Sequence, residues 1–341
     1  MNILITGGAG YIGSHVVKQL LEITQHNIII VDNLSTGNLN ILNTLQDIRT
    51  FKFIKLDLKE FDAVDILIKE NQIDVIFHFA ASISVAESIQ NPLKYYLNNT
   101  VNTTNLIECL VKNGVKKFIF SSTAAVYGEP SFSHNSNFNI DETFALNPIN
   151  AYGMSKLMSE KIVQDVASVS DLKFIIFRYF NVAGADMFYK NNTLIPRIGE
   201  LHNPETHLIP LVVQTALGKK ESISIFGNDF NTTDGTCIRD YIHVEDLAAV
   251  HIKAIEYLEN NQSDIFNVGY GRGYSVKEVI ETIQEVSKSN FKVVISKRRE
   301  GDSSKLIANG DKLKAKMNWT PKYNNLKLIC QSAYVWEKMN D

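Results

Sequence analysis

Thr6-Gly7-Gly8-Ala9-Gly10-Tyr11-Ile12-Gly13 is the stretch that decides the fold, because it follows the apolar run Ile3–Ile5 and opens a segment with helical spacing. Its glycines at every third position permit a tight turn and let backbone amides approach a pyrophosphate, while the following helix adds partial positive charge at its amino terminus. A glycine pattern alone is weak support. Its place between a strand and a helix predicts a dinucleotide-binding turn.

Continuous apolar strands alternate with helical segments through the first half of the chain. The expected strands are Ile3–Ile5, Ile28–Val31, Phe51–Leu56, Val75–Phe79, Phe118–Phe120, Phe174–Phe177 and Phe266–Val268. The expected helices include Ala63–Lys69, Pro92–Val111 and Ala151–Val169. This alternation predicts an α/β fold with a doubly wound parallel sheet of the Rossmann type, whose ligands bind at the carboxyl ends of the strands.

A second, smaller α/β domain is expected after about residue 181, where loops rich in Asn, Pro and Thr interrupt the alternation. We expect residues 1–181, with 238–266 returning, to form the cofactor domain. Residues 182–237 and 267–341 are then expected to form the substrate domain. A chain of 341 residues with 45% hydrophobic residues is long enough for both.

Composition excludes several function classes. The net charge is −3 and the chain has no basic block, which argues against a nucleic-acid partner. No apolar run reaches membrane-spanning length, and the first residues do not resemble a signal peptide. Cys109, Cys237 and Cys330 are far apart and form no metal-binding pair. We therefore expect a cytoplasmic protein without a membrane partner.

Asp32 favours NAD as the dinucleotide. It ends the second expected strand, 19 residues after Gly13, where an acid can accept hydrogen bonds from the adenosine ribose hydroxyls and repel a 2′-phosphate. Neither Arg nor Lys occurs in Asn33–Gly37, so NADP is disfavoured. The alternative is that Asp32 is an ordinary solvated turn carboxylate. Asp57, after the third strand, is placed to reach the adenine.

Tyr152 and Lys156 are the candidate catalytic pair. They are spaced i and i+4 on an expected helix, so they share one face. A free tyrosine has a pKa of about 10 and is a poor base at neutral pH. A nearby lysine cation and an oxidised nicotinamide would both favour the phenolate, which could then remove a proton from a hydroxyl while hydride leaves the same carbon.

The same spacing also occurs at Tyr323 and Lys327 and at Tyr334 and Lys338, which we interpret as accidental. What distinguishes Tyr152 is its position after the fifth strand, which ends in Ser121-Ser122-Thr123. A hydroxyl from that strand end can hydrogen-bond the reacting oxygen. The alternative for these hydroxyls is a structural role in satisfying backbone groups.

The glycine turn, the Tyr152–Lys156 pair and Thr123 resemble the extended short-chain dehydrogenase/reductase family, and further blocks resemble its UDP-glucose 4-epimerases. These blocks run in family order over nearly the whole chain: His78–Ala81, Phe118–Ser122, Val126–Gly128, Arg178–Asn181, Ile225–Asp229, Arg239–Val244 and Arg298–Asp302. Each block alone is unspecific, but together they are specific.

The resemblance implies transient oxidation at sugar carbon four by tightly held NAD, rotation of the keto sugar and return of hydride to its other face. Tyr152 is implied as base and then acid, Lys156 as its partner and a ribose contact, and Thr123 as sharing the proton at oxygen four. The implied NAD contacts are Gly7, Gly10, Tyr11, Ile12, Gly13, Asp32, Asn33, Asp57, Leu58, Phe79, Ala80, Ala81, Asn98, Tyr152, Lys156 and Phe180. The implied UDP-sugar contacts are Thr123, Asn181, His207, Leu208, Phe226, Arg239, Tyr241, Val276, Arg299, Asp302 and Leu306.

The resemblance also sets expectations about partners and metals. Helices from Pro92 and from Ala151 carry apolar side chains on more than one face and pair across a two-fold axis in related proteins, so we expect a homodimer. Ile83 stands where some members have a cofactor-contacting lysine, and His207 where some have asparagine. No third ligand is evident near His202 and His207, so we assign no metal.

Three other functions remain as alternatives. An epimerase of another UDP-sugar, such as a pentose, is the nearest. A sugar-nucleotide 4,6-dehydratase needs an extra acid and base, typically directly after Thr123, where this chain has Ala124-Ala125. A non-catalytic NAD-sensing regulator would be favoured by loss of Tyr152 or Lys156, and both are present.

The resemblance also bears on the substrate range. Leu306 stands where relatives restricted to plain hexoses have a tyrosine, and the smaller side chain predicts room in the sugar pocket for an acetamido group.

Overall fold

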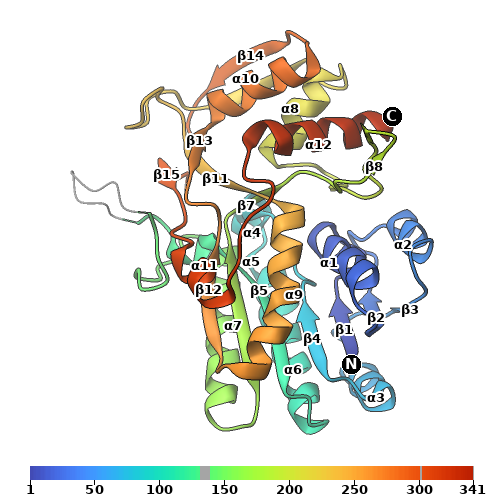
Figure 1. Cartoon of the computed structure of the whole chain (residues 1–341). Coiled ribbons are helices and arrows are strands. Elements are labelled where there is room, and N and C mark those ends of the chain that lie inside the picture. The colour runs from blue at the N-terminus through green and yellow to red at the C-terminus, as the bar shows by residue number, and fades with distance from the viewer. Residues whose placement is uncertain (131–138, 300–301, 341) are drawn as a thin grey trace. The chain divides into compact units, whose positions relative to one another are not determined.

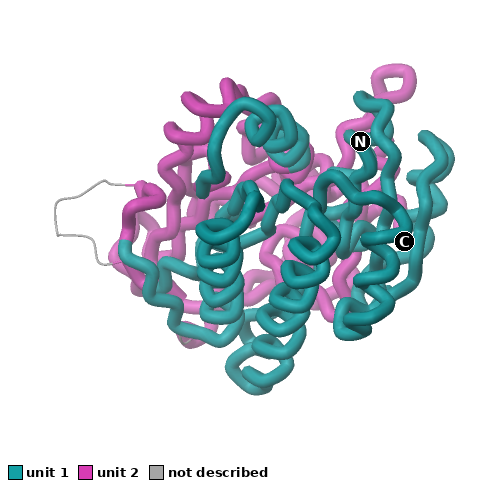
Figure 2. The backbone as a smooth tube through the Cα atoms, turned by 90° about the horizontal axis from the view of Figure 1, so that it is seen from below, with its two compact units in different colours: residues 1–128, 145–179, 248–266 teal, residues 129–144, 180–247, 267–341 magenta. Residues whose placement is uncertain are grey.

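The computed structural model describes residues 1–130, 139–299 and 302–340, and the chain divides into two compact units (Figure 2). Unit 1 contains residues 1–128, 145–179 and 248–266, and unit 2 contains residues 129–144, 180–247 and 267–341. Over the described residues, no helix combines the length and the apolar character needed to cross a membrane.

Unit 1 is built on a seven-stranded sheet (Figure 1) in the order β12-β6-β5-β4-β1-β2-β3. The strands are β1 (Asn2–Thr6), β2 (Asn27–Asp32), β3 (Lys52–Lys55), β4 (Val75–His78), β5 (Lys117–Thr123), β6 (Lys173–Tyr179) and β12 (Asp264–Val268). The pairings among β1 to β6 are parallel. The chain winds outward from β1 through β3 and then resumes at β4 on the other side of β1, which creates a topological switch point between β1 and β4. The predicted fold class is confirmed.

Helices cover both faces of this sheet. They are α1 (Tyr11–Ile23), α2 (Leu39–Gln46), α3 (Phe61–Asn71), α4 (Val85–Gln90), α6 (Asn102–Lys112), α7 (Ala151–Ser168) and α9 (Val244–Asn260). One face packs Leu4, Ile76 and Phe118 against Leu106 of α6 and Val163 of α7 in a single apolar cluster. The strands alternate between the two faces, so Phe77 and Phe177 point to the other one, where the His251 ring of α9 lies 6.3 and 4.9 Å from theirs.

The prediction of one continuous α-helix over Pro92–Val111 is wrong in one respect. The structure has α5 (Pro92–Tyr95), a π-helical turn η1 (Tyr96–Val101) and then α6. The wide turn directs the buried Asn99 side chain inward, where its Oδ1 accepts from the Ser82 amide at 2.8 Å and its Nδ2 donates to Ser155 Oγ at 3.1 Å. These hydrogen bonds compensate for the local loss of regular helix geometry.

Unit 2 has a four-stranded sheet in which β11 (Ile238–His243) pairs with β7 (Asn181–Ala183), β13 (Gly273–Ser275) and β15 (Lys305–Leu306). A parallel pair, β10 (Ser222–Phe226) with β14 (Lys292–Ser296), lies apart from it in the pairing scheme. The remaining elements are the hairpin β8 (Tyr189–Lys190) with β9 (Thr193–Leu194) and the helices α8 (Leu208–Ala216), α10 (Val276–Ser287), α11 (Asp311–Met317) and α12 (Leu326–Met339).

The boundaries expected from the sequence differ from this division in three segments, of which 180–181 is a shift of two residues. Residues 238–247 belong to unit 2, because β11 pairs only with strands of that unit among the described residues. Residues 129–144 also belong to it, since Ile140 forms a bridge with Ala308 and accepts a hydrogen bond from Asn267 Nδ2 at 2.8 Å.

Candidate active site

The glycine turn of unit 1 is a close-packed connection between β1 and α1. Gly7 has a φ of 73°, and a Cβ there would come within 2.6 Å of the Ala80 amide nitrogen. A Cβ on Gly13 would overlap the carbonyl oxygen of Gly7. Gly10 is the N-cap of α1 and offers no capping side chain, so the first turn of the helix has amide groups available for an anionic ligand.

Asp32 supports this turn directly. Its Oδ2 accepts from the Ala9 amide at 3.0 Å and its Oδ1 from the Leu34 amide at 2.8 Å. Burial raises the pKa of Asp32 above its usual range, while these two hydrogen bonds lower it. The carboxylate therefore has a structural role in the turn, in addition to the ribose contact expected from the sequence.

The other expected cofactor contacts of unit 1 lie at the ends of its strands. Asn33 follows β2 and donates through Nδ2 to Asp57 Oδ2 at 3.0 Å. Leu58, the residue after Asp57, is buried. The amide of Phe79 donates to the Thr6 carbonyl at 3.0 Å, which joins the ends of β4 and β1. Ala80 and Ala81 continue from there, Asn98 lies in η1, and Ile83 is exposed.

Thr123, Tyr152 and Lys156 are brought together in unit 1. Thr123 ends β5, and its hydroxyl hydrogen-bonds the Tyr152 phenol. Both Tyr152 and Lys156 lie on α7, which begins with the Asn150 side chain accepting from the Gly153 amide at 2.8 Å. Gly153 allows α7 to approach the turn after β5, because a Cβ would lie 2.6 Å from the Ala125 carbonyl oxygen.

The pKa shifts of Tyr152 and Lys156 differ in part from those expected from the sequence. Burial of its hydroxyl raises the pKa of Tyr152, and the Thr123 hydrogen bond opposes that rise. Burial lowers the pKa of Lys156 to about 7, against the attraction of Glu160. Within the chain itself desolvation therefore outweighs any stabilisation of the phenolate, so a bound cationic group would have to supply it.

Lys156 is held from two sides. Its Nζ donates to the Ser121 carbonyl at 2.8 Å and lies 5.0 Å from the centre of the Phe120 ring. One helical turn further along α7, the buried Glu160 pairs with Arg178 of β6, whose Nη2 lies 2.7 Å from Glu160 Oε2. Sequence reasoning missed Glu160. The signal was available, since an arginine in a buried strand requires an acid as its partner.

Most of the expected substrate contacts in unit 2 lie on the strands β7, β10, β11 and β15 or at the starts of the helices α8 and α10. Arg239 and Tyr241 lie on β11, where Arg239 is opposite Leu306 of β15 and Tyr241 is opposite Asn181 of β7. Arg239 Nη2 is also 3.7 Å from Asp302 Oδ1. Phe226 ends β10, and the guanidinium of the exposed Arg299 lies 3.7 Å from the centre of its ring. Leu208 begins α8 and Val276 begins α10, while Phe180, which was expected to contact NAD, precedes β7.

His207 has partners that the sequence did not suggest. The structure gathers Glu200, His202, Glu205 and His207, with ligand atoms within 4.8 Å of one another. Burial opposes the charged form of His207, but hydrogen bonds with both glutamates raise its pKa to about 10. The expectation that no third ligand lies near the two histidines is therefore wrong, because Glu200, just before them, and Glu205, between them, bring in two carboxylates.

Comparison with known proteins supports the resemblance throughout the chain. Residues 3–269 match the NAD dependent epimerase/dehydratase family. The chain is 43% identical over 339 residues to a UDP-glucose 4-epimerase of Halalkalibacterium halodurans, covering 99% of this chain and 96% of the relative.

Solved structures agree with this assignment. The UDP-Glc/GlcNAc 4-epimerase of Campylobacter jejuni is 49% identical with a TM-score of 0.85, covering 99% of both chains. A UDP-glucose 4-epimerase of Bifidobacterium longum in complex with NAD+ and UDP is 32% identical with a TM-score of 0.92, covering 100% of this chain and 99% of that one. The chain therefore belongs to the NAD dependent epimerase/dehydratase family.

Proposed function

We propose that this chain interconverts UDP-glucose and UDP-galactose by transient oxidation at sugar carbon four with tightly bound NAD. The observation that carries the proposal is the hydrogen-bonded pair Thr123 and Tyr152, with Lys156 one helical turn away on α7. Such a group of residues can take a proton from a sugar hydroxyl and return it to the same oxygen.

The residues of unit 1 fit NAD. Gly7 and Gly13 leave no space for a side chain, so a pyrophosphate can approach the backbone at the start of α1. Asp32 offers carboxylate oxygens at the end of β2 for a ribose. When bound, NAD supplies a hydride acceptor and donor for carbon four.

The chain's own residues supply the proton chemistry. Tyr152 takes the proton from oxygen four and later returns it. Thr123 hydrogen-bonds the reacting group, and Lys156 adds positive charge beside the phenol when it is protonated. Ala124 and Ala125 follow Thr123 in the short turn η2 and carry no acid or base, which disfavours the dehydratase alternative.

Unit 2 offers groups for the UDP portion. Arg239 and Arg299 are cations suited to a diphosphate, and Phe226 is an aromatic face suited to a uracil ring. The C. jejuni relative is described as acting on both UDP-Glc and UDP-GlcNAc. With Leu306 in place of a bulkier tyrosine, this chain is proposed to accept UDP-N-acetyl sugars as well.

The test is to incubate purified protein with UDP-galactose and follow formation of UDP-glucose without added NAD. Activity in the absence of added cofactor supports both the reaction and the tight binding. Bound NAD without turnover on any UDP-sugar would instead favour the NAD-sensing regulator. Turnover confined to UDP-pentoses would favour the pentose epimerase.

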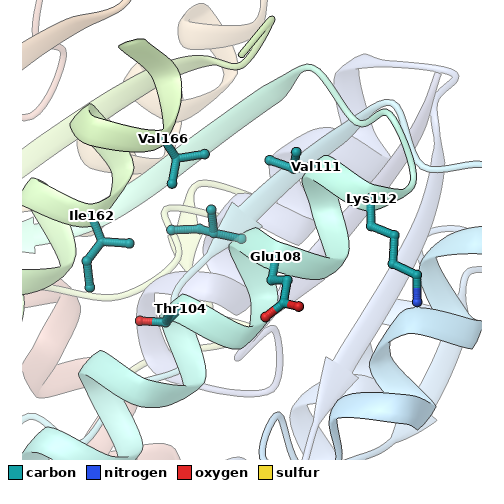
Figure 3. A pocket seen from close by; sticks show the side chains of 7 residues that line it. Thr104, Glu108, Val111, Lys112, Ile162 and Val166 are labelled. Carbon is teal, nitrogen blue, oxygen red and sulfur yellow. The ribbon is translucent and has the colours of Figure 1, made fainter. Parts of the chain in front are cut away.

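We also propose a homodimer formed through α6 and α7. A groove of about 370 Å³ between these helices is lined by Thr104, Ile107, Glu108, Val111, Lys112, Ile162 and Val166 (Figure 3). Leu93 and Leu97, just before α6, are 70% and 60% exposed. Exposed apolar surface of this kind is typical of an interface, and a second copy presents the same helices for four-helix packing.

Light scattering should therefore give twice the chain's 38.4 kDa. Ile162→Glu should shift the mass to that of one chain, because it places a charge in the groove. Val169→Lys, at an exposed position outside the groove, is the matched control and should remain dimeric. A wild-type mass of one chain at micromolar concentration would contradict the proposal.

A cytoplasmic location is proposed as well, supported by the three unpaired, buried cysteines.

A further inference from the structure

Residues 200–207 form a loop of unit 2 that carries two glutamates and two histidines immediately before α8. The loop is anchored at its start, since Trp336 Nε1 of α12 donates to the Glu200 carbonyl at 2.9 Å. A Cβ on Gly199 would lie 2.5 Å from the Trp336 ring, so the backbone sits directly on that side chain. Glu200 is buried at 7% exposure. The first of the four side chains is therefore held in a fixed, desolvated position.

All four side chains point toward one place. The Nδ1 atoms of His202 and His207 lie 2.9 and 2.8 Å from the same oxygen, Glu200 Oε1. His207 Nδ1 is also 3.0 Å from Glu205 Oε1, and His202 Nδ1 is 3.9 Å from Glu205 Oε2. Two imidazole nitrogens and two carboxylates therefore converge from a single short segment.

These distances approach those of a four-coordinate metal site. With metal–ligand bonds of about 2.0–2.2 Å, a tetrahedron places its ligand atoms roughly 3.3–3.6 Å apart. The four histidine–glutamate separations of 2.8 to 3.9 Å lie on both sides of that range, and all four ligand atoms lie within 4.8 Å of one another. Changes of about 1 Å in the ligand-atom separations would bring them to those of a tetrahedral site.

Charge and ligand type also favour a divalent cation. With both imidazoles deprotonated, as metal ligation requires, the two glutamates leave a charge of −2, which one divalent ion neutralises. Nitrogen and carboxylate ligands together match Zn²⁺, whereas Ca²⁺ prefers six to eight oxygens.

We propose that Glu200, His202, Glu205 and His207 form a structural Zn²⁺ site that clamps the loop leading into α8. The inference rests on the cluster alone and does not depend on the proposed epimerase reaction. The glutamate at 205 is already oriented for ligation, because its Oε1 accepts from the Thr206 and His207 amides, each at 2.7 Å. A ligand held in this way reduces the reorganisation that metal binding requires.

The test uses tag-free full-length protein with its native cofactor content. After equilibration with Zn²⁺ and removal of free metal, elemental analysis should find about one equivalent per chain, and Co²⁺ should give the strong visible bands of a tetrahedral site. His202→Ala and Glu205→Gln should each weaken Zn²⁺ binding by roughly tenfold or more. His26→Ala and Glu221→Gln change the same residue types outside the cluster and should bind as the wild type does.

Thermal unfolding supplies a second readout that needs no activity. Zn²⁺ should raise the unfolding temperature of the wild type and of the two controls, but not that of His202→Ala. If His202→Ala does not fold, Glu205→Gln carries the comparison. The proposal is overturned if wild type and cluster variants bind Zn²⁺ equally, if no tetrahedral Co²⁺ spectrum forms, or if Ca²⁺ binds as tightly as Zn²⁺.

Discussion

Arg178 and Glu160 form a buried, two-pronged ion pair one helical turn from Lys156. Arg178 Nη2 lies 2.7 Å from Glu160 Oε2, and Arg178 Nε lies 3.1 Å from Glu160 Oε1. The carboxylate also accepts from Ser122 Oγ, and Arg178 Nη1 donates to the Tyr127 hydroxyl at 2.9 Å. The pair thus joins β5, β6 and α7 near the catalytic residues, and protein groups hydrogen-bond both of its charges.

Glu160→Gln should destabilise the chain by about 3–5 kcal/mol, because it leaves the Arg178 charge buried and uncompensated. Denaturant unfolding monitored by circular dichroism measures this loss. Glu285→Gln, which removes the exposed partner of Lys327, is the matched control and should change the free energy of unfolding little. Equal effects of the two substitutions would show that the buried pair contributes no more than a surface one.

Tyr152→Phe should fold normally and lose activity by about 10²- to 10⁴-fold, since it removes only the phenolic oxygen that moves the proton. Turnover of UDP-galactose at saturating substrate is the measurement. Tyr334→Phe removes the same atom from the other Y-x-x-x-K pattern on α12 and should retain activity. Near-native turnover of Tyr152→Phe would assign the base to another residue.

Gly13→Ala should reduce the NAD that co-purifies with the protein by roughly tenfold or more, because overpacking commonly costs about 1–3 kcal/mol and the added Cβ overlaps the Gly7 carbonyl. The cofactor is released by denaturation and quantified in the supernatant. Gly114→Ala strains the backbone, since φ there is 71°, but its methyl group meets nothing within 4 Å, so this control should keep its NAD. A Gly13→Ala protein with a full complement of NAD would contradict the proposed pyrophosphate site.

Lys156 should make stability depend on pH in a defined direction. Burial lowers its pKa from 10.5 to about 7, so between pH 7 and 10 the unfolded chain binds a proton that the folded chain does not. Stability therefore rises with pH through this window. In NAD-stripped protein, Lys156→Met should remove that rise. A difference in unfolding free energy between variant and wild type that stays constant from pH 7 to 9.5 would refute the shifted pKa.

The central sheet could be predicted because buried parallel strands are continuous apolar runs, and each expected strand from Ile3–Ile5 to Phe174–Phe177 matches a strand of unit 1. The same local reasoning failed at η1, since a single wide turn around Asn99 leaves the surrounding helical periodicity almost unchanged. Long-range pairings were also beyond it. Nothing local to Arg239 indicates that Leu306 lies opposite it in a neighbouring strand.

The candidate site was predictable to a similar degree. Tyr152 and Lys156 share a helix, so their proximity follows from spacing, and Thr123 followed only from the family resemblance. The Glu200–His207 cluster did not follow from spacing, because its geometry depends on how an irregular loop turns. The direction of the Tyr152 pKa shift was also missed, since desolvation depends on packing that a sequence does not display.

Leu306→Tyr should separate the two substrate classes. Leu306 lies on β15 opposite Arg239 of β11, is half-buried, and has Lys305 as its neighbour on the other face of the strand. A tyrosine at position 306 adds a ring and a hydroxyl where an acetamido group is proposed to fit. Overpacking a filled site commonly costs about 1–3 kcal/mol, and about 1.4 kcal/mol is tenfold in rate. Turnover of UDP-N-acetylglucosamine should therefore fall by roughly tenfold or more while that of UDP-galactose is nearly unchanged.

Lys305→Tyr is the control, because it adds the same ring to the opposite face of the strand and should spare both reactions. It separates a steric effect at position 306 from a general disturbance of β15. The idea fails if wild-type protein does not turn over the N-acetylated substrate, or if both substitutions reduce the two reactions in parallel.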